Sequence, residues 1–293
     1  MTAARILVTG GTGTIGSHVV QMLIERDVKA RLLVRNPEKA AEAAEAGFEI
    51  VRGDLAERAS LNRAVECIRS VLLISAPDER QRELHSNAIA AAREAKVQHV
   101  VRVSAFGADE NAPIFLARSH GESERELESS GMAYTHIRPH LFMQNFFGYI
   151  PTIHTYGCFY GCLRDARLPM VDARDIAAVC VEALTGKGHE GKTYELTGPE
   201  AFSMPDAAEV LSDACGEPIR YVDLPPDQLE RGMRDAGVPD WLAHDLTWLY
   251  SNVFALGQGS EVSDAVARVT GRKPFRFAEF ARDYADRFRK PAA

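Results

Sequence analysis

Short apolar runs alternate with amphipathic segments along the first half of the chain. The runs are almost continuously hydrophobic, as expected of strands that are buried on both faces. The segments between them repeat apolar residues at helical spacing. The predicted strands are 5–9, 30–34, 49–51, 70–74, 99–104 and 134–138, and the predicted helices are 15–26, 39–46, 81–95 and 115–130. This alternation predicts a doubly wound parallel sheet covered by helices, the Rossmann-like α/β class.

The rhythm changes after Pro139. Residues 140–165 are rich in aromatic side chains and show no regular period, so this segment is expected to be irregular. Helices and short strands are predicted beyond it. We expect a Rossmann-like dinucleotide-binding domain at 1–139. Residues 140–293 would form mainly a smaller α+β substrate-binding cap, with some segments returning to the sheet.

Composition narrows the classes of function. The 293 residues contain 34 Lys and Arg against 41 Asp and Glu, and this acidic balance argues against a nucleic-acid partner. No apolar run is long enough to span a membrane, and no secretory leader follows Met1. The five cysteines are dispersed without a CxxC pair, and the nine histidines lack a metal-binding pattern. We expect a cytoplasmic monomer or homodimer without a bound metal or a membrane partner.

The most specific motif joins the first predicted strand to the first predicted helix. The segment from Thr9 to Gly16 satisfies both GxGxxG and TGxxGxxG. Glycines there let the backbone approach a pyrophosphate, and the start of the helix offers unpaired N–H groups and a positive dipole end. A P-loop is disfavoured because Ser17 stands where it needs Lys, and a plain glycine-rich turn is the other alternative. The predicted dinucleotide contacts are Gly10, Thr12, Gly13, Thr14 and Ile15.

Residues after the second and third predicted strands bear on the choice of dinucleotide. NAD enzymes usually carry Asp or Glu at the end of the second strand, where it binds the ribose hydroxyls. Arg35 stands there instead and Lys39 follows, so a 2′-phosphate would meet cations and no carboxylate. NADP(H) is therefore preferred and NAD(H) is the alternative, unless Arg35 is simply solvated. The segment where an adenine would lie adds Gly53, Asp54 and Leu55. Asp54 is equally a candidate helix N-cap.

With these residues assembled, the chain resembles the atypical short-chain dehydrogenase/reductases of the NmrA-like group. It is similar to the bacterial NAD(P)H-dependent quinone, azo-dye and triphenylmethane-dye reductases of that group, over nearly its whole length. Besides the glycine loop, the markers are Arg35-Asn36, Gly53-Asp54, Ser75-Ala76-Pro77, His120 with Glu124, Arg138-Pro139, Phe142 to Asn145 and Val171 to Asp175. The resemblance implies a Rossmann-like fold and a dinucleotide site that includes Ser75, Ala76, Pro77 and Pro139.

The chain departs from ordinary short-chain dehydrogenases at the proton donor, which in those enzymes is a Tyr with Lys four residues later. None of the eight Tyr here has Lys at that spacing. Leu116 and His120 stand at the corresponding helix positions, so the resemblance implies that His120 holds the nicotinamide ribose or donates the proton. The structural alternative is a surface His facing Glu124. Ser104 stands where such enzymes keep a catalytic Ser, and capping of the strand end is its alternative.

Aromatic side chains are dense between 142 and 160, where they could wall a pocket for a planar substrate or pack the cap. The predicted pocket residues are His140, Phe142, Asn145 and Phe146. We predict an NADPH-dependent oxidoreductase that transfers hydride to a planar, electron-poor small molecule such as a quinone or a conjugated dye-like compound. The alternative is a non-catalytic NADP(H) sensor that acts through a protein partner.

Overall fold

The computed structural model describes residues 5–291 and divides the chain into two compact units. Unit 1 comprises Met1–Pro139 and Ala173–Glu195, and unit 2 comprises His140–Asp172 and Leu196–Ala293. The ends of the two predicted domains, at 1–4 and 292–293, lie outside the described residues. The chain therefore leaves unit 1 after Pro139, returns to it at Ala173, and finishes in unit 2.

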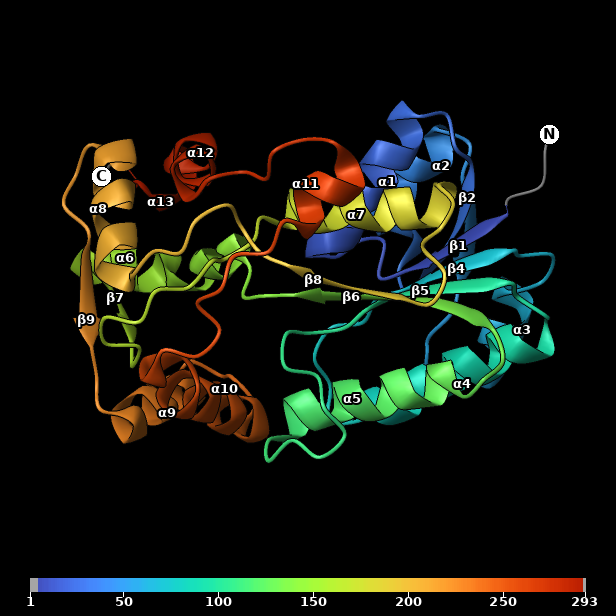
Figure 1. Cartoon of the computed structure of the whole chain (residues 1–293). Helices are drawn as coiled ribbons and strands as arrows, with labels where there is room; N and C mark the ends of the chain where they lie inside the picture. The colour runs from blue at the N-terminus through green and yellow to red at the C-terminus, as the bar shows by residue number, and fades with distance from the viewer. Residues whose placement is uncertain (1–4, 292–293) are drawn as a thin grey trace. The chain divides into compact units, whose positions relative to one another are not determined.

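A seven-stranded sheet with the strand order β3-β2-β1-β4-β5-β6-β8 forms the centre of unit 1 (Figure 1). The strands are β1 (Ile6–Thr9), β2 (Ala30–Val34), β3 (Glu49–Arg52), β4 (Ser70–Leu73), β5 (His99–Val103), β6 (Ala133–Pro139) and β8 (Lys192–Leu196). The pairs from β3 to β6 are parallel, with Leu7 opposite both Arg31 and Val71. The order reverses between β1 and β4, which confirms the predicted doubly wound, Rossmann-like class.

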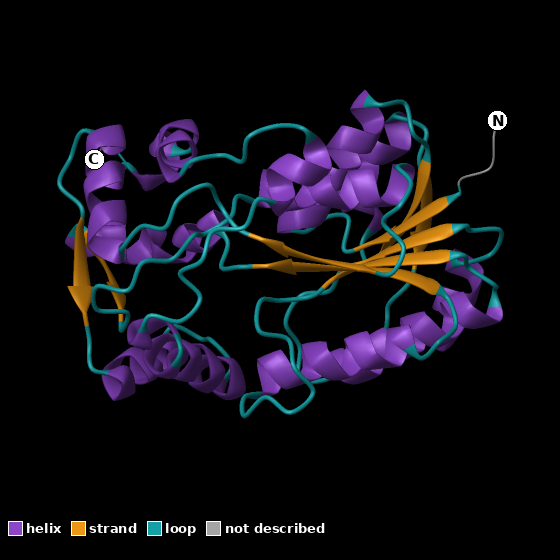
Figure 2. Cartoon of the chain, viewed as in Figure 1, coloured by secondary structure: helices purple, strands orange, loops and turns teal. Residues whose placement is uncertain are grey.

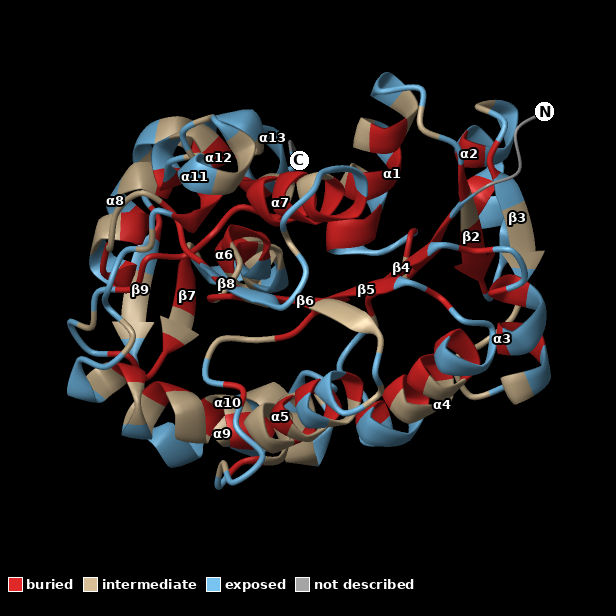
Figure 3. Cartoon of the chain, turned by 45° about the vertical axis from the view of Figure 1, so that its right-hand side comes forward, coloured by how far each residue is buried: buried red, intermediate tan, exposed pale blue. Residues whose placement is uncertain are grey.

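Helices cover both faces of this sheet (Figure 2). On one face α1 (Thr14–Glu25) packs against α7 (Ala173–Thr185), and on the other α4 (Gln81–Glu94) packs against α3 (Arg58–Ala64) and α5 (Phe115–Glu128). Every residue of β1, β4 and β5 is buried, and Figure 3 shows β4 and β5 in the colour of buried residues. This double cover explains why these strands are continuously apolar and do not alternate.

The predicted helix at 39–46 is shorter and less regular in the structure. It consists of a 3₁₀ turn, η1 (Pro37–Ala40), followed by α2 (Ala41–Glu45). The Asn36 side chain accepts a hydrogen bond from the Glu38 N–H and Pro37 fixes the first turn, so the backbone turns before the predicted start.

Unit 2 contains a two-stranded parallel sheet of β7 (Cys158–Gly161) and β9 (Arg220–Asp223). Its other elements are η2 (Met143–Tyr149), α6 (Ile150–Tyr156), α8 (Met204–Cys215), α9 (Pro226–Asp235), α10 (Asp240–Asn252), η3 (Phe254–Leu256), α11 (Ala265–Thr270), α12 (Phe277–Asp283) and α13 (Ala285–Phe288). The prediction that 140–165 is irregular was wrong, because η2, α6 and β7 lie there. Strand β7 pairs with a segment about 60 residues later, so its own sequence carries little local signal.

Candidate functional site

The glycine loop lies between β1 and α1, at the carboxyl end of β1 and beside the point where the strand order reverses. The hydroxyl of Thr9 accepts a hydrogen bond from the Ile74 N–H at 2.9 Å and donates to the Ile74 carbonyl at 2.8 Å. These two bonds join the end of β1 to the end of β4. In open α/β sheets this reversal point is where a dinucleotide lies.

Three glycines of the loop have different structural roles. Gly10 has φ +64°, and a Cβ there would lie 2.9 Å from the Ile74 carbonyl oxygen. At Gly16 a Cβ would lie 2.1 Å from the Gly10 carbonyl oxygen, so neither position accepts a side chain without moving backbone. Gly13 has φ −92°, and its Cβ would meet only the Gly10 oxygen at 3.3 Å. Gly10 and Gly16 therefore build the loop, whereas Gly13 leaves its outer surface open to a ligand.

The start of α1 is suited to an anion. Its N-cap is Gly13, which supplies no side-chain hydrogen bond, and no acidic residue lies in the first turn. Thr12, Gly13 and Thr14 are exposed, while Ile15 is buried in the core of unit 1. The first N–H groups of a helix lack partners within the helix, so the loop fits a pyrophosphate by backbone donors and dipole. Ile15 would contribute through its backbone only.

The two cations predicted to read a 2′-phosphate follow β2 and are both exposed. Among residues 5–291, no carboxylate forms an ion pair with Arg35 or Lys39. The nearest acidic residue in the chain, Glu38, lies in η1 between them and does not pair with either. The Arg35 guanidinium therefore retains its full hydrogen-bonding capacity for a phosphate.

The turn after β3 is shaped by packing and local hydrogen bonds. A Cβ at Gly53 would lie 2.6 Å from the Ser60 side chain, so this position requires glycine. The carboxylate of Asp54 accepts the Ala56 N–H at 2.9 Å, a local turn, and the N-cap of α3 is Glu57. The N-cap alternative for Asp54 was therefore wrong. Leu55 packs against the unit 1 core.

The remaining predicted cofactor residues follow β4 and end β6. Ser75 is half-buried and its Oγ lies 2.8 Å from His85 Nε2, while Ala76 and Pro77 are exposed. Pro139 is buried and its carbonyl accepts the Phe106 N–H at 2.9 Å. Ser75, Ala76 and Pro77 thus stand at the carboxyl end of β4, the strand next to the glycine loop.

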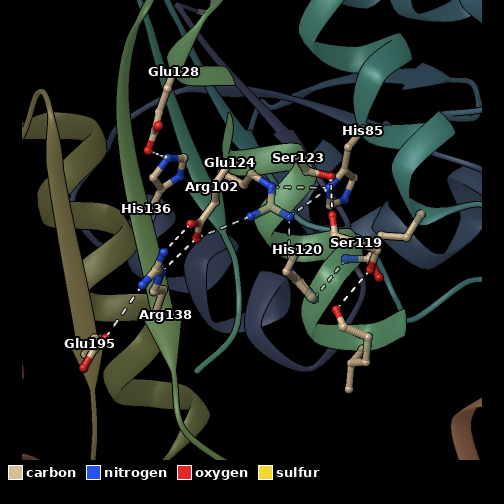
Figure 4. Close-up of polar contacts among 12 residues, drawn as sticks. His85, Arg102, Ser119, His120, Ser123, Glu124, Glu128, His136, Arg138 and Glu195 are labelled. Carbon is tan, nitrogen blue, oxygen red and sulfur yellow. Dashed lines mark hydrogen bonds and ion pairs between the residues drawn. The ribbon is translucent and has the colours of Figure 1, made fainter. Parts of the chain in front are cut away.

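A cluster of charged and imidazole side chains lies on the face of the sheet covered by α4 and α5 (Figure 4). We define the Arg102 cluster as Arg102, His85, His120, Glu124 and Arg138. Arg102 is on β5 and fully buried, and burial lowers its pKa to about 10. Arg138 donates to the Glu124 carboxylate through Nε at 3.0 Å and Nη2 at 2.5 Å, a bidentate pair.

His120 is held inside this cluster. Its Nδ1 lies 3.0 Å from Arg102 Nη2, and its Nε2 lies 2.9 Å from the side-chain amide of Gln81. The alternative of a surface His that pairs with Glu124 was wrong, because Glu124 bonds Arg138 instead. Burial, and then the charge of Arg102, lowers the pKa of His120 well below its ordinary value. The side chain is therefore neutral near pH 7.

Ser104 lies at the carboxyl end of β5 and is 4% exposed. Its N–H donates to the Ile137 carbonyl at 2.7 Å, which joins β5 to β6. Its hydroxyl faces the Glu124 carboxylate without a well-aligned hydrogen bond. Burial raises the pKa of Glu124, but hydrogen bonds, above all from Arg138, outweigh it and leave the pKa lowered. The catalytic role of Ser104 stays a prediction.

Two members of the Arg102 cluster, Arg102 and His85, and the neighbouring Gln81 were not predicted from the sequence. Arg102 carried a signal, since it is the one charged residue in the otherwise apolar run Val100 to Val103. A charge inside a strand buried on both faces needs partners from the covering helices. His85 and Gln81 gave no such signal, because helices at the surface of a sheet commonly carry polar residues.

The predicted substrate residues belong to unit 2. Phe146 is fully buried, with ring centroids 5.4 Å from Phe159 and 4.8 Å from Phe277, which favours the packing alternative for this ring. His140 is 2% exposed, its ring centroid lies 5.1 Å from that of Phe254 in a tilted arrangement, and burial lowers its pKa to about 4. Phe142 is half-buried and Asn145 is exposed. Of these four, Phe142 and Asn145 remain available to contact a substrate.

Over 5–291, no group of three or more His, Cys, Asp or Glu side chains could hold a metal ion. Within the same part of the chain, every helix is too short or too polar to cross a membrane.

The sheet order and the glycine loop define a dinucleotide-binding protein of the Rossmann type. The model of the NmrA-like family matches residues 2–280. The chain therefore belongs to the NmrA-like family, which confirms the resemblance noted in the sequence.

Relatives with named activities match most of the chain. An NAD(P)H azoreductase of Xenophilus azovorans is 39% identical over 283 residues, which is 97% of this chain and 99% of that protein. Quinone oxidoreductase 2 of Escherichia coli is 32% identical over 81% of this chain and 84% of that protein.

Solved structures agree with this relationship. The NADPH complex of the Escherichia coli NADPH-dependent quinone oxidoreductase superimposes with a TM-score of 0.85 at 28% identity, over 94% of this chain and 98% of that one. The NADP(H) complex of the Citrobacter sp. triphenylmethane reductase gives 0.84 at 27% identity, over 96% and 99% of the two chains.

Proposed function

We propose that this protein is an NADPH-dependent oxidoreductase that reduces a planar, electron-poor small molecule, a quinone or a conjugated dye. The observation that carries the proposal is the open glycine loop at the reversal point of the sheet, followed by an unpaired Arg35 after β2. The relatives support it, since their names specify reduction of quinones and dyes and two of their structures hold NADPH or NADP(H).

Different residues of unit 1 would bind different parts of the dinucleotide. The loop from Gly10 to Ile15 would bind the pyrophosphate through backbone N–H groups. Arg35 and Lys39 would bind the 2′-phosphate, and the turn at Gly53 to Leu55 would lie against the adenine. The nicotinamide half would lie along residues that follow or flank the strands beyond the reversal point. These residues are Ser75 to Pro77, Ser104, His120 and Pro139.

The bound dinucleotide supplies the hydride, and the chain supplies binding, orientation and hydrogen-bond donors. A quinone becomes a hydroquinone by gaining one hydride and one proton. Since the proton can come from solvent water, this reduction does not require the Tyr that ordinary short-chain dehydrogenases use. The absence of a Tyr–Lys pair therefore favours quinone-like acceptors over simple carbonyls.

The test is consumption of NADPH with a panel of quinones, azo dyes and triphenylmethane dyes, followed by its absorbance. We expect turnover with at least one acceptor and faster turnover with NADPH than with NADH. Tight NADPH binding without consumption on any acceptor would overturn the enzymatic proposal and support the sensor. We also propose a reducing compartment such as the cytoplasm, since all five cysteines are free thiols and four of them are buried.

A further inference from the structure

The Arg102 guanidinium lies between two imidazoles. Its Nε and Nη2 lie 3.3 and 3.2 Å from His85 Nδ1, and Nη2 lies 3.0 Å from His120 Nδ1. A guanidinium has donors only, so both Nδ1 atoms must accept. An imidazole that accepts at Nδ1 cannot be doubly protonated. Both rings are therefore neutral and carry their proton on Nε2.

The two Nε2–H groups point to residues at the carboxyl end of β4 and the start of α4. His85 Nε2 lies 2.8 Å from Ser75 Oγ, so the imidazole donates and the Ser75 hydroxyl proton stays available for another acceptor. His120 Nε2 lies 2.9 Å from the Gln81 amide. Because Nε2 carries the proton, the Gln81 amide turns its oxygen toward it and accepts the Nε2–H. Gln81 is 1% exposed, so this hydrogen bond holds His120 inside the cluster.

The charges around the imidazoles favour the neutral state. On β5 Arg102 touches both rings, and β6 adds a second cation, Arg138. The one carboxylate in the cluster is Glu124 of α5, which is bound by Arg138 and lies 3.9 Å from Arg102 Nη1. Burial first, and then the Arg102 charge, lowers the pKa of both His85 and His120. Neither ring therefore carries the second, acidic proton of an imidazolium at neutral pH.

We propose that Arg102 is a positioning residue for the reduction, fixing His85 and His120 as neutral Nε2–H donors so that the Ser75 O–H faces the cofactor's nicotinamide half. This inference rests on the proposed function for its last step. Its consequence for the chemistry is that His120 orients groups and is not the proton donor. The acceptor gains its hydride from the cofactor and its proton from solvent water, which balances the reduction of a quinone to a hydroquinone.

The direct test is ¹⁵N NMR of the histidine side chains in the wild-type protein, since the two ring nitrogens of each tautomer have distinct shifts. Signals are assigned with His85→Gln and His120→Gln. We expect both rings to be neutral and protonated on Nε2 from about pH 5.5 to about pH 8, across the ordinary titration of His. A doubly protonated ring, or a proton on Nδ1, in that range would overturn the proposal. This readout needs no turnover, so it is independent of whether the proposed function is correct.

The functional arm uses Arg102→Met, which removes the donors and keeps an unbranched apolar side chain. We expect kcat with a quinone to fall roughly 10- to 100-fold, because small errors in orientation cost that much. NADPH affinity should change by less than about 3-fold, since the glycine loop and Arg35 remain. Arg102→Lys should recover part of kcat by restoring one charged donor. Unchanged kcat in a folded Arg102→Met protein would overturn the positioning role.

Arg31→Met is the matched control. Arg31 is an arginine of the same sheet, on β2, and donates to the Ala64 and Glu66 carbonyls at 2.7 and 2.8 Å, away from the Arg102 cluster. It should lose stability without losing kcat per folded molecule. If Arg102→Met does not fold, the proposal is tested with the wild-type spectra and with Arg102→Lys. Imidazole signals of the Nε2–H form in Arg102→Lys support the proposal. Loss of these signals in an Arg102→Lys protein that keeps full kcat overturns it.

Discussion

Replacing Arg35 by Ala tests how this chain selects its cofactor. The side chain is exposed and forms no ion pair among the described residues, so its removal should change the free energy of unfolding by less than about 0.5 kcal/mol. Any effect on binding is therefore an effect on the bound state. A charge-assisted hydrogen bond to a 2′-phosphate contributes about 1.5–3 kcal/mol. That corresponds to roughly 10- to 100-fold in affinity.

The assay is titration calorimetry of wild type and Arg35→Ala with NADPH and NADH. NADPH should bind wild type more tightly than NADH by roughly 10- to 100-fold, and the variant should lose most of this ratio while its NADH affinity is unchanged. Arg69→Ala is the matched control, because Arg69 is also exposed but precedes β4 and so lies at the opposite end of the strands. If Arg35→Ala keeps the full NADPH preference, Arg35 does not read the 2′-phosphate.

Four further substitutions test other parts of the site. Gly13→Val should fold normally but show no NADPH binding in calorimetry, whereas Gly16→Val should disrupt the fold of the loop. Wild-type NADPH affinity in Gly13→Val would show that the pyrophosphate does not bind at this loop. His120→Ala should lower kcat roughly 10- to 100-fold and NADPH affinity far less. An unchanged kcat with every acceptor would show that His120 has no role in the reaction. Glu124→Gln should cost about 3–5 kcal/mol of unfolding free energy above pH 4.5 in urea titrations, because it leaves the buried Arg102 without a carboxylate and Arg138 with only Glu195, at 3.8 Å. Since the folded pKa of Glu124 is lowered, the gap between wild type and variant should narrow as the pH falls below 4.5; a gap that stays constant would refute this.

Much of unit 1 could be predicted from the sequence because local pattern and tertiary environment agree there. Strands buried on both faces are continuously apolar, and the glycine loop combines a spacing with a strand-to-helix context. The loop geometry supports this interpretation, since a Cβ at Gly10 or Gly16 would lie 2.9 or 2.1 Å from a carbonyl oxygen, whereas one at Gly13 would lie 3.3 Å from the Gly10 oxygen.

The Arg102 cluster and the fold of 140–165 could not be predicted in the same way. Arg102 of β5 meets His85 of α4 and His120 of α5, and no local period links positions 85, 102 and 120. Aromatic density alone does not separate packing from binding, so it predicts Phe146 in a pocket, whereas the structure buries the ring against Phe159 and Phe277. The Arg102 cluster and the fold of 140–165 both depend on contacts between residues far apart in the chain, and the local sequence pattern does not show such contacts.

The most direct test of the central claim is an anaerobic reduction with matched amounts of NADPH, a quinone and the protein. The account predicts that wild type consumes one NADPH for each quinone converted to hydroquinone, and that Gly13→Val, which should fold but not hold the pyrophosphate, consumes none. Stoichiometric hydroquinone formation by Gly13→Val, or wild-type protein that binds NADPH without oxidising it, would contradict the account.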